Sequence, residues 1–187
     1  MKRIFYRNRL FAVTICMIAL LVQNPSVVDA QNAFKGTENE DFIFGIPDSL
    51  LFRIQNNIPE EASAEPMKKR KLLVMNLNRI HGKVRKGHPS IPYMNYAFKL
   101  MGENAGAWET WFSNDTMAFK PEFLRQFDAI CFNNTAGVLC DDPQLRQNLL
   151  DYVFSGGGFI GIHAAGATFC QYPVYDQFPE FGEMLGL

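Results

Sequence analysis

The chain has 187 residues and a formal net charge of −1, with 48% hydrophobic and 13% aromatic residues. This length suits one domain with appendages, and the apolar content is sufficient for a hydrophobic core. The near-zero net charge excludes a global electrostatic field that would attract nucleic acid or an anionic membrane surface.

Residues 1–30 are predicted to be a signal peptide. Basic residues precede an apolar run at residues 10–22, which is shorter than the roughly 20 residues that a membrane span needs. Val28 and Ala30 form a small-x-small cleavage pattern before Gln31. We expect the domain to be exported, periplasmic or secreted, and to touch a membrane only through this segment before cleavage near Ala30. An uncleaved anchor is the alternative.

Residues 31–70 are predicted to be a lead-in segment. Asp48 is expected to cap a short helix over residues 49–57, which Pro59 ends. Residues 60–70 run from acidic to basic and predict a linker.

From residue 71 to residue 187, short apolar segments alternate with amphipathic ones. Strands are predicted at residues 72–76, 108–112, 128–132 and 159–162. Ser90 and Asp142 are predicted to cap helices, Lys120 is predicted to begin a short helix through Arg125, and residues 78–89 are predicted to be a loop. The last strand is expected in the middle of the sheet, covered on both faces. This order predicts an α/β domain with a doubly wound parallel sheet.

The chain contains neither a G-x-G-x-x-G motif nor a phosphate-binding G-x-x-x-x-G-K-[ST] motif, so we predict no nucleotide cofactor. Cys131, Cys140 and Cys170 match no zinc or redox spacing. Cys131 is expected to be a buried, inert side chain. A disulfide between Cys140 and Cys170 is left open.

The segment 156–166 is predicted to form a glycine turn, a strand and a sharp bend that presents His163. Gly161 and Ala165 lie two residues on either side of His163, which is the spacing of a nucleophile elbow. The usual occupant is Ser or Cys, so a histidine argues against acyl-enzyme chemistry. The alternative is that the two small residues serve packing and His163 only ends the strand.

The predicted site lies at the carboxyl ends of the parallel strands, where ligands of open α/β sheets bind. The catalytic residues are predicted to be His163 and His88. The substrate-binding residues are predicted to be Asn78, Asn133, Asn134 and Thr135. Amides, a hydroxyl and imidazoles suit a polyhydroxylated or carbonyl-bearing small molecule, and acidic groups are scarce, which disfavours paired-carboxylate glycoside hydrolysis.

The histidines have further interpretations. A helix beginning at His163 would disfavour its cationic form through the helix dipole. A divalent metal held by His163 and His88 is an alternative to a metal-free site. His88 precedes Pro89 and could order its loop, and His81 could be a bystander in the same basic loop.

With residues 71–74, 88–92, 127–135 and 156–165 in view, the chain resembles a ThuA-like (trehalose utilisation) domain of the class I glutamine amidotransferase-like superfamily. The resemblance implies a flavodoxin-like fold over residues 71–187, with His163 replacing the amidotransferase cysteine, so that no glutaminase activity is expected. Family members continue beyond Gly186 with further strands, which implies a sheet that is incomplete at the C-terminus.

The resemblance also implies a role in the metabolism of trehalose or keto-disaccharides, with a small carbohydrate as the partner. The leading hypothesis is therefore an exported sugar-processing domain. The alternative is a non-catalytic carbohydrate-binding or partner-docking module.

Overall fold

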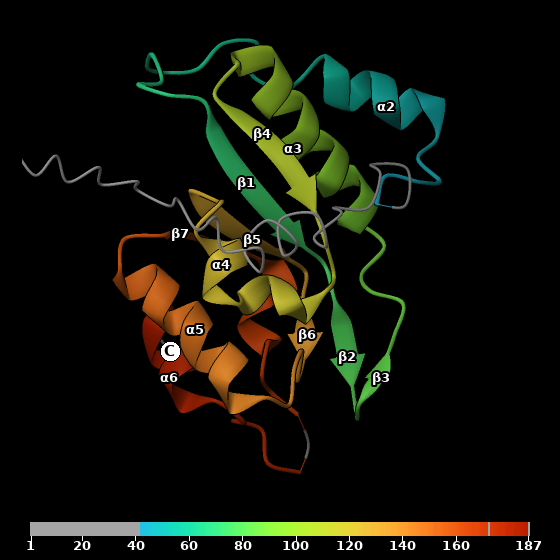
Figure 1. Cartoon of the computed structure of the whole chain (residues 1–187). Coiled ribbons are helices and arrows are strands. Elements are labelled where there is room, and N and C mark those ends of the chain that lie inside the picture. The colour runs from blue at the N-terminus through green and yellow to red at the C-terminus, as the bar shows by residue number, and fades with distance from the viewer. Residues whose placement is uncertain (1–41, 172, 187) are drawn as a thin grey trace, which may run out of the picture.

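The computed structural model describes residues 42–171 and 173–186, and its main sheet contains four parallel strands. The strands are β1 (Arg70–Met75), β4 (Trp108–Phe112), β5 (Ala129–Asn133) and β7 (Gly158–Ile162). They lie within two residues of the predicted ones. Helices flank the sheet, so the fold is the predicted α/β, flavodoxin-like type (Figure 1).

The strand order β4-β1-β5-β7 follows from how the chain winds. After β1 the chain builds β4 on one side, then returns to add β5 and β7 on the other. The order therefore reverses between β1 and β5, where Val74 pairs with Cys131. In such sheets this reversal leaves a crevice at the carboxyl ends of the strands.

Side chains alternate between two apolar layers. Leu73 and Phe132 point to the layer that contains α5 (Pro143–Phe154) and α6 (Pro179–Leu185). Leu72, Val74 and Cys131 point to the layer that contains α3 (Ile91–Ala105), through Phe98. Figure 1 shows α3 on one side of the sheet and α5 and α6 on the other.

The expectation that the strand at residues 159–162 lies in the middle of the sheet, covered on both faces, is wrong: β7 is the outermost strand of the described sheet, and one of its faces is partly open. Phe159 packs against Phe132 and Phe181 on one face. On the other face α3 contacts β4 and β5, and Ile160 remains 36% exposed. A short apolar run cannot distinguish one covered face from two.

A second, smaller sheet takes two of its strands, β2 (Asn78–Ile80) and β3 (Lys83–Val84), from the segment 78–89 that was predicted to be a loop. It also contains β6 (Ala136–Gly137), and its strand order is β3-β2-β6. These strands are two or three residues long and carry no apolar alternation, which explains why the sequence did not reveal them. β2 follows β1 and β6 follows β5, so the small sheet extends the carboxyl edge of the main one.

The helix starts agree with the sequence in part. Asp142 caps α5 and accepts a hydrogen bond from the Gln144 N–H at 2.8 Å. Asp48 is the first residue of α2 (Asp48–Gln55) rather than its cap, because Pro47 occupies the cap position. Lys120 precedes α4 (Pro121–Leu124), which follows the 3₁₀ helix η2 (Thr116–Phe119).

The disulfide that the sequence left open between Cys140 and Cys170 does not form, because both thiols are free. The Cys140 Sγ lies 4.0 Å from the Asp142 carbonyl oxygen, and the Cys170 Sγ lies 3.9 Å from that of Gly166. Cys131 is buried as expected, and burial raises the pKa of its thiol to about 12.

The predicted signal peptide lies outside the described residues. Within residues 42–171 and 173–186, no helix has both the length and the apolar character needed to cross a membrane.

Candidate functional site

His163 lies directly after β7, at the carboxyl edge of the sheet, and is exposed. Its φ of 50° places it in the left-handed region, which costs a non-glycine residue roughly 1–3 kcal/mol. It begins η3 (His163–Ala167), a 3₁₀ helix of five residues, rather than an α-helix. The dipole argument made from the sequence therefore has little basis, whereas the strained presentation expected of an elbow is present.

The bend is as cramped as the small residues around His163 predicted. A Cβ atom at Gly161 would lie 3.3 Å from the Ala165 Cβ and 3.4 Å from the Phe159 Cε1. Ala165 is buried. A larger side chain at either position would displace its neighbours and move the bend that holds His163.

The structure brings His88 and His163 together, although they come from different loops. Their ring centroids are 4.8 Å apart and the ring planes are inclined by 54°. His88 precedes α3, and its side chain is also exposed. Two imidazoles at this separation can contact the same small molecule.

Ser90 orients the His88 ring. The Nδ1 of His88 lies 2.7 Å from the Ser90 Oγ and accepts a hydrogen bond from the Ser90 N–H at 3.2 Å. Ser90 occupies the N-cap position of α3, as predicted, but its hydroxyl binds His88 rather than capping the helix. Because a backbone N–H can only donate, the neutral His88 ring carries its proton on Nε2.

Asn134 holds the other ring. The Oδ1 of Asn134 lies 2.8 Å from the His163 Nδ1, and the Asn134 N–H donates to the Ile162 carbonyl at 3.2 Å. Asn134 follows β5 and has a φ of 57°, so two adjacent strand ends both turn through the left-handed region. Asparagine tolerates this conformation better than most residues.

The remaining predicted substrate-binding residues lie behind the histidines. Asn133 and Thr135 are fully buried, and the Thr135 Oγ1 lies 2.6 Å from the Thr168 Oγ1. The Asn78 Nδ2 donates to the carbonyls of Asn76 and Asn134, at 3.2 and 2.9 Å. Their hydrogen bonds are made within the protein, and direct contact with a substrate stays a prediction.

Sequence reasoning missed Asn95, which hydrogen-bonds Asn133 from α3. A signal was available, because Asn95 is the polar member of the buried stripe that includes Ile91 and Phe98. A polar residue on such a stripe needs a buried partner. His81 lies apart from the pair, in the exposed turn between β2 and β3, where its N–H donates to the Gln171 Oε1 at 2.6 Å.

A divalent metal held by His163 and His88 stays a prediction. In the described part of the chain, no group of three or more His, Cys, Asp or Glu side chains could hold a metal ion. The neutral His88 ring presents an N–H rather than a lone pair, since Ser90 occupies its Nδ1. Zinc sites in proteins use three or four protein ligands, so zinc at this pair would need further ligands beyond the two imidazoles.

No cysteine occupies the bend at His163, where a cysteine nucleophile would be presented. Burial raises the pKa of the Cys140 thiol to about 11 and also raises that of Cys170. Raised pKa values reduce the thiolate fraction that such chemistry needs.

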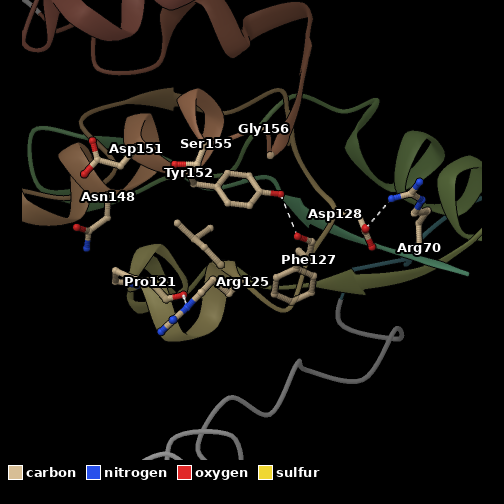
Figure 2. A pocket seen from close by; sticks show the side chains of 12 residues that line it. Arg70, Pro121, Arg125, Phe127, Asp128, Asn148, Asp151, Tyr152, Ser155 and Gly156 are labelled. Carbon is tan, nitrogen blue, oxygen red and sulfur yellow. Dashed lines mark hydrogen bonds and ion pairs between the residues drawn. The ribbon is translucent and has the colours of Figure 1, made fainter. Parts of the chain in front are cut away.

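A hollow of about 470 Å³ lies at the opposite, amino edge of the sheet (Figure 2). Several of its polar groups are already engaged: the Tyr152 hydroxyl donates to the Phe127 carbonyl at 3.2 Å, and Arg70 and Asp128 form an ion pair at 3.0 Å. Ligands of parallel sheets bind at the carboxyl ends of the strands. The histidine pair is therefore the better candidate site.

A family model described as ThuA, trehalose utilisation, matches residues 79–186. The match begins in β2 and includes both His88 and His163. No curated protein and no solved structure matches the chain. Because the family match covers more than half of the sequence, the chain belongs to the ThuA (trehalose utilisation) family.

Proposed function

We propose that this ThuA-family chain is an exported domain that binds and processes a sugar of the trehalose or keto-disaccharide class. The observation that carries the proposal is the pair of exposed imidazoles, His88 and His163, with ring centroids 4.8 Å apart at the carboxyl edge of the sheet. In this proposal His163 occupies the place of the amidotransferase nucleophile and does not form an acyl intermediate.

The chemistry of the pair suits proton transfer on a keto sugar. The Nδ1 atoms of His88 and His163 are both held by the protein, which leaves the Nε2 atom of each ring for a substrate. The His88 Nε2–H donates a hydrogen bond to a keto oxygen, and His163 accepts a proton from the sugar. A positioned acid–base group of this kind typically contributes about 10²–10⁴-fold to a rate.

The test compares three histidine variants on a panel of keto-sugars and disaccharides. We expect His163→Ala to lower turnover by about 10²–10⁴-fold and His88→Ala to lower it less. His81→Ala is the matched control, since His81 lies in an exposed turn away from the pair, and it should leave turnover unchanged. If His163→Ala leaves the turnover of every sugar unchanged, the proposed catalytic role is wrong.

A second candidate function is a non-catalytic carbohydrate-binding or partner-docking module. The observation that favours it is that both rings stand exposed, whereas hollows of about 470 and 510 Å³ lie elsewhere, at the amino edge and between α2 and α3. Calorimetry would decide: sugar binding that His163→Ala abolishes, without turnover in the unaltered protein, supports the module.

The proposal of export rests on the N-terminal sequence pattern alone. N-terminal sequencing of the protein recovered from outside the cytoplasm should give Gln31 as the first residue. Recovery only with the cell fraction and an intact N-terminus would contradict cleavage near Ala30.

A further inference from the structure

Three buried asparagines connect the backbone of Phe42 to the ring of His163. The Asn133 Nδ2 donates to the Asn95 Oδ1 at 2.8 Å, and the Asn134 Nδ2 donates to the Asn133 Oδ1 at 2.8 Å. The Asn134 Oδ1 then meets the His163 Nδ1 at 2.8 Å. The exposed fractions of the three asparagines are 0 or 1%, so water does not compete for these bonds. Asn95, Asn133 and Asn134 thus form a relay of hydrogen bonds that leads to His163.

Two backbone carbonyls fix the direction in which the amides of this asparagine relay donate. The Asn95 Nδ2 donates to the Phe42 carbonyl at 2.9 Å, and the Asn133 Nδ2 also donates to the Ile91 carbonyl at 3.2 Å. A carbonyl oxygen only accepts, so the NH₂ group of each amide must face it. The oxygen of Asn133 therefore faces Asn134, and the NH₂ group of Asn134 faces Asn133.

This direction determines which nitrogen of His163 carries the proton. The atom of Asn134 that faces the His163 Nδ1 is an oxygen, which cannot donate, so Nδ1 must be the donor. We infer that Asn133 and Asn134 are positioning residues that hold neutral His163 as the Nδ1–H tautomer, with a lone pair on Nε2 at the open edge of the sheet.

Reversing the direction would be unfavourable. Turning the Asn133 amide over would place its oxygen against the Ile91 carbonyl and the Asn95 oxygen, leaving buried acceptors unpaired. Each unpaired buried group costs roughly 1–3 kcal/mol. The Ile91 carbonyl fixes the Asn133 amide independently of Asn95, so the loss of Asn95 alone should not reverse the direction of the asparagine relay.

The two rings of the pair then have opposite hydrogen-bonding roles. His88 presents a donor at Nε2, because the Ser90 N–H occupies its Nδ1. His163 presents an acceptor at Nε2. This arrangement suits a substrate that offers a carbonyl oxygen to one ring and a hydroxyl group to the other. The inference deepens the proposed function, although its test requires no sugar.

The first test is histidine tautomer analysis by NMR. Protein with ¹⁵N-labelled histidine is recorded in a long-range ¹H–¹⁵N correlation spectrum at alkaline pH, and the signals are assigned with His81→Ala and His88→Ala variants. We expect the protonated-nitrogen shift at Nδ1 of His163 and at Nε2 of His88. A His163 signal with the protonated shift at Nε2 would overturn the inference, whatever the outcome of sugar assays.

The second test uses paired variants of Asn134 to separate the effect of its hydrogen bond on the His163 tautomer from an effect of packing. Asn134→Gly suits the φ of 57° but removes the acceptor, and it should shift His163 toward the Nε2–H tautomer. Asn134→Asp keeps an acceptor oxygen and should retain the Nδ1–H tautomer. An Asn134→Gly spectrum identical to that of the unaltered protein would overturn the inference.

The role of Asn133 is tested in the same way, by NMR of paired variants. Asn133→Leu should free the Asn134 amide to turn over and give a mixture of tautomers. Asn95→Leu, at an equally buried position, should leave the tautomer unchanged, because Ile91 still anchors Asn133. If Asn133→Leu does not fold, the Asn134→Gly and Asn134→Asp pair decides the question.

Discussion

The two edges of the parallel sheet differ in chemistry and in backbone conformation. The carboxyl edge carries imidazoles, amides and hydroxyls, and its residues Asn134, His163 and Phe169 have positive φ values. The amino edge carries the charged groups Arg70 and Asp128 and has a hollow of about 470 Å³ (Figure 2). This hollow therefore lies at the edge where Arg70 and Asp128 already pair with each other.

The amino edge is marked by paired charges, whereas the carboxyl edge is marked by strained backbone. At the amino edge Asp128 accepts hydrogen bonds from the Arg70 side chain at 3.0 Å and the Lys71 N–H at 2.9 Å, and it pairs with Lys68 at 2.7 Å. Such a network stabilises a strand start. At the carboxyl edge the strained residues Asn134 and His163 form the candidate site, and strained backbone tends to cluster at functional sites. The strained backbone of Asn134 and His163 therefore favours the carboxyl edge, whereas the hollow alone would favour the amino edge.

The largest effect on stability is expected from a change in the buried asparagine relay at the carboxyl edge. Asn133→Leu leaves the Ile91 carbonyl, the Asn95 Oδ1 and the Asn134 Nδ2 without their buried partner. We expect the free energy of unfolding to fall by about 3 kcal/mol or more, measured by urea denaturation. Asn148→Ala, on α5 at the other edge, should change it by about 0.5 kcal/mol or less. Equal effects of the two variants would remove the contrast between the edges.

The next effect tests the cramped bend. Gly161→Ala adds a Cβ at 3.3 Å from the Ala165 Cβ, and we expect it to destabilise the protein by about 1–2 kcal/mol, measured by thermal unfolding. Gly166→Ala is the matched control, because a Cβ there meets nothing within 4 Å. Similar melting temperatures for the two variants would show that the bend tolerates larger residues.

The ion pairs of the amino edge should have a smaller, pH-dependent effect. The Lys68 ammonium, with the Lys71 N–H and the Arg70 guanidinium, lowers the pKa of Asp128 to about 2 from 3.8. A carboxyl group with a depressed pKa stabilises the fold above its unfolded pKa, and this stabilisation is lost as the pH falls from about 4 to about 2.

The variant Asp128→Asn should therefore lower stability by about 1 kcal/mol at neutral pH and flatten the stability profile between about pH 4 and pH 2. Sugar turnover should not change, because Asp128 lies at the opposite edge from the histidine pair. A loss of turnover in a folded Asp128→Asn protein would move the functional site to the amino edge.

The smallest effect concerns the cysteines. Because Cys131, Cys140 and Cys170 are free thiols, a reducing agent should not change the melting temperature. A fall of several degrees on reduction would instead indicate a disulfide, which typically contributes about 2–4 kcal/mol.

The sequence by itself determined the order of strands and helices and the cramped bend at His163. Continuous apolar runs and helical stripes depend on local spacing, so residues 108–112 and the helix capped by Asp142 could be placed without coordinates. Gly161 and Ala165 are informative for the same reason, because a tight bend limits the size of its nearest neighbours in the chain.

Only the tertiary structure decided which of these elements meet. The edge position of β7, the pairing of β2 with β6 and the approach of His88 to His163 depend on contacts between distant segments. The direction of the asparagine relay depends on two backbone carbonyls, of Phe42 and Ile91, that no spacing rule identifies. Hydrogen-bond direction is a property of assembled partners, and a sequence pattern specifies the residue types without specifying those partners.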